Sequence, residues 1–161
     1  MPDLRKISWI TVDPGMNTGV AGWENSDKIE APVETWLLKS REASWERAAD
    51  ALSRDLLSLV SGLQNLQKVY IEEPAFHGSP AGLVVAAKSL VKLTLLVGRY
   101  WELCSFDHVV SLVPIRRWKG NLPKRVINMR IERALGKEIM AKKQDTLDAI
   151  GIGLFLKGAW R

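Results

Sequence analysis

The chain has little of what stabilises secreted or membrane-bound proteins. Its 161 residues contain a single cysteine, Cys104, which excludes an intramolecular disulfide and agrees with a reducing compartment. With His77 and His108 as the two histidines, the sequence offers no ligand set typical of a structural zinc site. No apolar run approaches the roughly 18 residues of a membrane helix, and the first residues lack the apolar core of a signal peptide. We therefore expect an intracellular protein without a membrane partner.

Negative charge is scarce in one particular segment. The net charge is +5, but residues 114–143 hold ten Lys and Arg against two Glu, a local +8 that leaves −3 for the remainder. A solvated helix face is the common reason for such a run. Because this run begins in a loop with proline and glycine, it favours contact with a polyanion.

The order of the expected elements indicates the fold class. Alternating or β-rich apolar runs predict strands at 6–13, 18–24, 31–40, 68–73 and 108–114. Helical spacing predicts helices at 43–63 and 83–103, a basic loop and helix ending at Gly136, and a last helix over 143–156. This order predicts an α/β fold: one domain, 1–161, with a mixed five-stranded sheet flanked by helices.

Four acidic residues lie next to expected buried segments, where a charged side chain has no role in core packing. Asp13 ends the first expected strand, directly before Pro14-Gly15, and Glu72 ends the fourth. Asp145 and Asp148 share one face of the last helix, at the margin of its expected apolar stripe, because they are three residues apart. Glu73 is an alternative to Glu72, although it should point to the opposite face of a regular strand.

Clustered carboxylates suit metal-assisted phosphodiester hydrolysis. Two Mg²⁺ ions about 4 Å apart can activate a water and stabilise the leaving oxygen, and Mg²⁺ prefers hard oxygen ligands. Taken singly, each acid also fits a structural role. Asp13 could start a turn, Glu72 could be a polar strand end, and Asp145 could face the helix dipole.

Four stretches together resemble the motifs of RuvC-type Holliday-junction resolvases, a branch of the RNase H-like nuclease superfamily. In chain order they are "VDPGMNTGVAGW", "VYIEEPAF", the basic "VPIRRWKGNLPKRVINMRIERALG" and "QDTLDAIGIG". The resemblance spans nearly the whole chain and implies an RNase H-like sheet. The compact size and divergent loops are similar to those of phage-encoded members, so the location implied is the cytoplasm of a bacterium or of a phage-infected host.

The resemblance also implies roles for individual residues. Asp13, Glu72, Asp145 and Asp148 match the catalytic metal ligands, for two Mg²⁺ per site with Mn²⁺ able to substitute. Lys119 matches a functional basic residue near the scissile phosphate. Phe76 falls near an aromatic that contacts the junction core, one residue later relative to Glu72.

Basic residues around these motifs are expected to contact DNA. Phosphate contacts position a substrate without specifying its sequence, and the candidates are Arg116, Arg117, Lys119, Lys124 and Arg125. Lys142 and Lys143, just before Asp145, are placed to lead the backbone toward the metals. Trp118 could stack on an exposed base or brace the loop against the sheet.

The family resemblance implies a homodimer that cuts four-way DNA junctions by paired symmetric nicks. Helix 83–103, with Leu83, Ala86, Leu90, Leu93 and Val97, resembles the family's dimerisation segment, although such a stripe also fits ordinary core packing. A two-fold dimer would present two active sites to equivalent strands of a junction.

Three alternatives remain open from the sequence. The same site would serve an RNase H-like nuclease acting on RNA or an RNA–DNA hybrid. A non-catalytic junction-binding protein would retain the fold, but the four intact acids argue against it. An actin-like ATPase or sugar kinase also begins with an Asp-x-Gly turn, yet needs two such domains to enclose a nucleotide.

Overall fold

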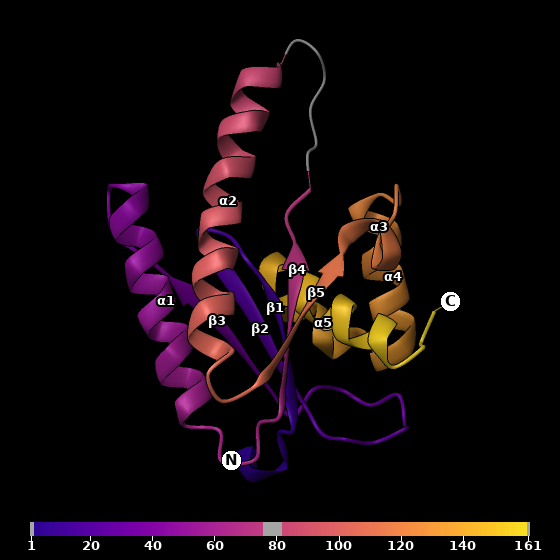
Figure 1. Ribbon diagram of the computed structural model, residues 1–161. Coiled ribbons are helices and arrows are strands. Elements are labelled where there is room, and N and C mark those ends of the chain that lie inside the picture. Colours follow the sequence, from indigo (N-terminus) through magenta and orange to yellow (C-terminus); the bar gives the residue numbers. More distant parts are fainter. Residues whose placement is uncertain (1, 76–81, 161) are drawn as a thin grey trace.

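A mixed five-stranded sheet forms the centre of the molecule (Figure 1). The computed structural model describes residues 2–75 and 82–160. The sheet order is β3-β2-β1-β4-β5, with β2 antiparallel to both β1 and β3, and β4 parallel to both β1 and β5. The strands are β1 (Trp9–Asp13), β2 (Asn17–Trp23), β3 (Glu34–Lys39), β4 (Lys68–Glu73) and β5 (Val109–Pro114). The predicted fold class is confirmed.

Helices cover the two faces of the sheet unequally. The helices α1 (Trp45–Ser61) and α2 (Leu83–Cys104) lie on one face, and α5 (Gln144–Leu156) lies on the other. Outside α5 are the short α3 (Ile115–Trp118) and the basic α4 (Lys124–Leu135). Short 3₁₀ turns occupy Leu4–Lys6 and Lys137–Ala141. No helix within 2–75 and 82–160 combines the length and apolar character that crossing a bilayer requires.

Alternation along the strands divides the core into two clusters. In β1, Ile10 and Val12 pack with the buried residues of α1 and α2. Thr11 points to the other face, where its hydroxyl donates to the Ala149 carbonyl of α5 at 2.7 Å. Since successive side chains of a strand face opposite sides, Asp13 shares the α5 face with Thr11. The same alternation in β4 places Glu72 on that face, opposite to Ile71.

Helix α5 is more deeply buried than its sequence stripe predicts. The expected buried stripe is Leu147, Ile150 and Leu154, but all nine residues of 146–154 are buried. The reason is that α5 lies between the sheet and the α3–α4 layer, so it has partners on both sides. The predicted margin for the acidic pair is therefore wrong for Asp148, which is 8% exposed.

A second difference concerns the first strand, which begins later than predicted. Residues 4–6 form a 3₁₀ turn, and β1 starts at Trp9. The turn is stabilised by the Asp3 carboxylate, which accepts from the Arg5 backbone N–H at 3.2 Å. The remaining predicted elements agree with the structure to within about three residues at their ends, the usual uncertainty of such boundaries.

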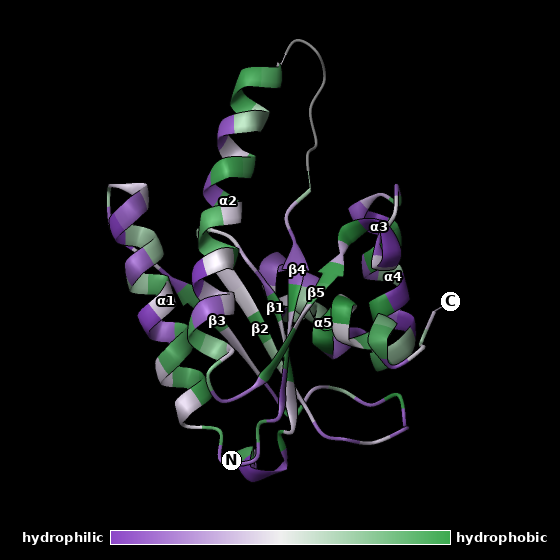
Figure 2. Cartoon of the chain, in the orientation of Figure 1, coloured by the Kyte–Doolittle hydropathy of each residue, from purple (hydrophilic) through white to green (hydrophobic). Residues whose placement is uncertain are grey.

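Helix α2 extends well past the end of the sheet (Figure 1). Its buried residues, Leu96, Val97, Tyr100 and Cys104, all belong to its C-terminal half. The N-terminal half carries exposed apolar side chains, and Figure 2 shows hydrophobic residues around it. Core packing thus accounts for the predicted stripe at Val97, but not for Leu83, which is exposed.

Candidate active site

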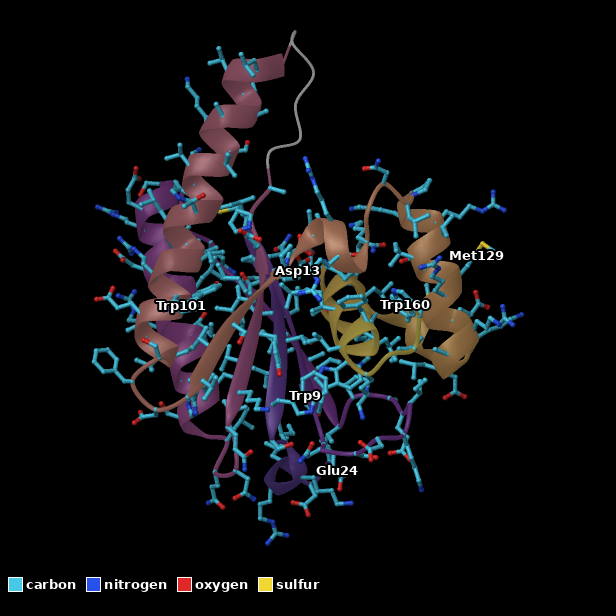
Figure 3. All side chains as sticks on the ribbon, turned by 45° about the vertical axis from the view of Figure 1, so that its right-hand side comes forward. Trp9, Asp13, Glu24, Trp101, Met129 and Trp160 are labelled. Carbon is cyan, nitrogen blue, oxygen red and sulfur yellow. The ribbon has the colours of Figure 1, made fainter. Side chains whose placement is uncertain are left out.

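The strand register brings Asp13 and Glu72 together. Strands β1 and β4 are parallel neighbours, with Val12 paired to Ile71, so the next residues of both strands lie side by side. Strand alternation directs both side chains to the α5 face of the sheet, and Figure 3 shows Asp13 at the end of the sheet. Glu73 is exposed, whereas Glu72 is half-buried. The structure therefore places Glu72, and not Glu73, beside Asp13.

The absence of a side chain at Gly19 allows the first turn of α5 to lie next to Asp13. Gly19 pairs with Asp13 across β1 and β2. A Cβ on Gly19 would collide with the backbone carbonyl of Asp145. Because glycine has no Cβ, α5 can begin directly over β2, next to Asp13. Asp145 and Asp148 follow on this turn, and sequence reasoning did not identify Gly19 as the residue that admits them.

The pKa values of Asp13 and Glu72 respond both to burial and to the neighbouring acids. Burial raises the pKa of Asp13 well above its ordinary value, and the charges of Glu72, Asp148 and Asp145 raise it further. Burial also raises the pKa of Glu72 to about 7, a rise that Lys119 opposes and Asp148 reinforces. Like charges that cannot all ionise together favour either a shared proton or a bound cation.

Lys119 is the positive charge in this cluster. It caps the C-terminal end of α3, and its Nζ lies 3.7 Å from Asp148 Oδ2. The ammonium also lies 5.3 Å from the centre of the Trp118 ring, within the range of a cation–π contact. Its side chain is 15% exposed, so the charge is directed into the site.

The fold with this site is similar to solved structures of RuvC from Thermus thermophilus. One RuvC structure matches with a TM-score of 0.68 and 15% identity, covering 93% of this chain and 95% of that one. A second, RuvC in complex with a Holliday junction substrate, gives a TM-score of 0.69 and 16% identity, covering 94% of each chain. This chain has the RuvC fold.

No family model and no curated protein matches the sequence. At about 15% identity the likeness to RuvC establishes the fold alone. The chemistry of the site must therefore be argued from its own residues.

The donor set of this site fits a hard divalent cation, although it is not a closed cage. Within 2–75 and 82–160, no three His, Cys, Asp or Glu side chains form a group that could hold one ion as they stand. Mg²⁺ commonly uses one or two carboxylates and keeps several waters, so it needs no such cage. Burial is the main cause of the raised pKa values of Asp13 and Glu72, and neighbouring carboxylates add to it, so a cation bound here would favour their ionised forms.

The Trp118 side chain is buried in the hydrophobic core and does not lie on the protein surface. The ring is 2% exposed, so it cannot stack on a base, and the interpretation as a loop brace is the one that fits. A Cβ at Gly151 of α5 would lie 2.8 Å from this ring, which shows how tightly the ring packs. Its buried indole N–H has no hydrogen-bond partner of standard geometry among the described residues. The N–H nevertheless lies near enough to the Glu72 carboxyl to lower its pKa, against the larger rise caused by burial.

Most of the basic candidates for DNA contact are exposed. Six of them are exposed: Arg116, Arg117, Lys124, Arg125, Lys142 and Lys143. Pro123 caps α4, so the helix that carries Lys124 and Arg125 begins immediately beside the loop. Phe76 lies outside the described residues.

Two amides next to the acids were missed by sequence reasoning. Gln144 Nε2 donates to Asp148 Oδ1 at 2.9 Å. The same amide exchanges hydrogen bonds with Asn128 of α4, at 3.1 and 3.3 Å. The available signal was the spacing of Gln144 and Asp148, which are four residues apart on one helix face.

Proposed function

We propose that this protein is a metal-dependent endonuclease that resolves four-way DNA junctions by paired symmetric nicks. The observation that carries the proposal is the convergence of Asp13, Glu72, Asp145 and Asp148 with Lys119 at the edge of an exposed basic segment. The RuvC fold supports it, because one of the similar structures is RuvC with a Holliday junction substrate.

In this proposal Asp13, Glu72, Asp145 and Asp148 hold two Mg²⁺ ions, with Mn²⁺ able to substitute. When bound, such ions supply an activated water and stabilise the leaving oxygen of the phosphodiester. Lys119 stands beside Asp148 and neutralises charge near the scissile phosphate. The raised pKa of Asp13 and Glu72 means that metal binding displaces protons from these carboxyls.

In this proposal the basic segment positions the DNA strands. Arg116, Arg117, Lys124 and Arg125 contact phosphates, and Lys142 and Lys143 guide the backbone toward Asp145. Because these contacts are electrostatic, binding should weaken steeply as salt increases. Trp118 is not among them, since its ring is buried.

The active form in this proposal is a homodimer that joins through α2. An apolar groove between α1 and α2 is lined by Trp45, Leu83, Val84, Val91 and Leu95, among others. Contiguous exposed apolar surface of this kind is typical of an interaction site. Two-fold pairing along α2 would present two equivalent sites to the two-fold symmetric junction.

The test is cleavage of a synthetic four-way junction in Mg²⁺ or Mn²⁺ at low salt, beside an RNA–DNA hybrid and a linear duplex. We expect paired nicks in the junction. Glu72→Gln should lower cleavage by more than about 100-fold, since a ligand matters more than an outer-shell partner. Glu73→Gln is the matched control and should cut normally.

Junction binding should survive the Glu72→Gln substitution, because it removes an anion from the site. Preferred cutting of the hybrid would reassign the substrate to RNA or RNA–DNA hybrid. Binding without cutting by the wild-type chain would indicate a non-catalytic junction-binding protein. Equal cleavage by the Glu72→Gln and Glu73→Gln variants would refute the metal assignment.

A further inference from the structure

The carboxylate of Asp148 has a polar neighbour at each of its two oxygens, one hydrogen-bonded and one ion-paired. Oδ1 accepts from Gln144 Nε2 at 2.9 Å, and Oδ2 faces Lys119 Nζ at 3.7 Å. The hydrogen bond at Oδ1 and the ion pair at Oδ2 together limit the rotation of this carboxylate. Metal coordination depends on the direction of each lone pair, so an orienting partner has a direct chemical effect.

The orientation of Gln144 is determined by this contact. A carboxylate that carries charge can only accept, so the amide must present Nε2 to Asp148. Its Oε1 is then directed to Asn128, whose Nδ2 donates to it at 3.1 Å. The Asn128 carbonyl in turn accepts the other Nε2 hydrogen at 3.3 Å. Every donor and one acceptor position of the Gln144 amide are used.

Asn128 connects this contact to the basic helix. It lies on α4, four residues after Lys124 and three after Arg125, so all three belong to adjacent turns of one helix. Both basic residues are exposed, whereas Asn128 and Gln144 are half-buried. The two amides therefore link the surface proposed to bind phosphates with an acid proposed to bind metal.

We propose that Asn128 and Gln144 are positioning residues that hold Asp148 in the orientation for metal binding and tie it to α4. This inference rests on the proposed function for its role in cleavage. It requires that the amide pair exists in solution and that its loss disturbs the metal site more than the DNA surface.

The main variant is Asn128→Leu, which removes both hydrogen-bonding groups at similar size. Met129→Leu is the matched control, because Met129 is the next residue on α4, is 57% exposed and points outward (Figure 3). We expect kcat for the junction to fall about ten-fold in Asn128→Leu, the lower end of the range for outer-shell partners. KM and metal-free junction affinity should stay close to wild type.

The coupling between the two amides gives a sharper readout. Gln144→Leu should lower kcat at least as much as Asn128→Leu, and the double variant should be no slower than Gln144→Leu alone. Such non-additivity is expected when one residue acts through the other. Full additivity would overturn the proposal, since it would mean that Asn128 acts independently of Gln144.

Two measurements need no cleavage. Mn²⁺ affinity, followed by electron paramagnetic resonance, should fall about ten-fold in Asn128→Leu and be unchanged in Met129→Leu. The side-chain amide signals of Gln144 in a ¹H–¹⁵N spectrum should shift in Asn128→Leu and not in the control. If the wild type cuts no junction, the proposed function fails, while these two measurements still decide the positioning role. Unchanged Gln144 signals or equal Mn²⁺ affinity in the two variants would overturn it.

Discussion

Helices α5 and α2 are both rich in apolar residues, yet the fold treats them in opposite ways. Nine consecutive residues of α5 are buried, and the helix lies between the sheet and the α3–α4 layer. The N-terminal half of α2 lies beyond the sheet, with Leu83, Val84 and Val91 exposed. The comparison shows that an apolar helix can either fix a site from inside or present a surface for a partner.

The polar contacts beside α5 and along α2 also differ in burial. Next to α5, the Thr11 hydroxyl donates to Ala149 and accepts from the Trp23 indole N–H at 3.0 Å. Both bonds are buried, so the helix is held in one position over Asp13. Along α2, the ion pair of Arg99 with Asp50 of α1 is largely exposed, and such pairs contribute little. The C-terminal half of α2 has a buried polar contact as well, between the Tyr100 and Thr18 hydroxyls at 2.9 Å, so the contrast with α5 applies to the exposed N-terminal half.

Replacing one glycine by alanine in each helix should give the largest difference in stability between α5 and α2. Gly153→Ala in α5 should destabilise the protein by about 3 kcal/mol or more, because the new Cβ would collide with the buried Trp23 ring. Gly98→Ala in α2 should stabilise it by about 0.5–1 kcal/mol, because nothing lies within 4 Å and alanine is the better helix former. Urea unfolding of both variants is the measurement. Shifts of the same sign would contradict the contrast.

A pH series on metal-free protein should show the strain among the acids next to α5. The pKa of Glu72 is raised from 4.5 to about 7, so the folded chain keeps a proton that the unfolded chain releases. The free energy of unfolding should therefore fall as the pH rises from about 4.5 to about 7, by up to about 3 kcal/mol. Asp13, whose pKa is also raised, acts in the same direction.

Denaturation in a chelator at pH 5 and pH 8 measures this fall. Glu72→Gln is the control, because a neutral amide removes the Glu72 contribution and should flatten the profile. Added Mg²⁺ should restore stability at pH 8 if the site binds it, since a ligand of the native state stabilises that state. A steeper fall in Glu72→Gln than in the wild type would refute the assignment of the shift to Glu72.

A charge placed on α2 should have the smallest effect on folding and a specific effect on association. Val91 is 59% exposed in the apolar groove, so Val91→Glu should barely change stability. It should weaken dimerisation at least about ten-fold, equal to about 1.4 kcal/mol. Analytical ultracentrifugation measures this, with Met129→Glu on α4 as the control. Equal association of the two variants would exclude α2 as the dimer surface.

Most of the fold was predictable from local pattern. Alternation set the strands, helical spacing set α1 and α2, and Gly136 ended α4 as expected. The candidate acids were identifiable because Asp13 and Glu72 follow apolar strands in which a charge has no packing role. Strand alternation puts Glu72 and Glu73 on opposite faces but does not by itself say which of the two is a ligand; the structure has Glu72 half-buried and Glu73 exposed. The depth of α5 was not predictable, because the sequence does not show that α3 and α4 cover its outer side.

What the sequence by itself determined is the set of elements and the chemical character of each, including a charge imbalance that needs no folding to be read. What the tertiary structure decided is which groups meet. Gly19 admits α5 to the sheet, Asn128 reaches Gln144 across two helices, and Trp118 turns inward. The physical reason is that such contacts join residues distant in the chain. Their distances depend on packing between elements, which local periodicity does not encode.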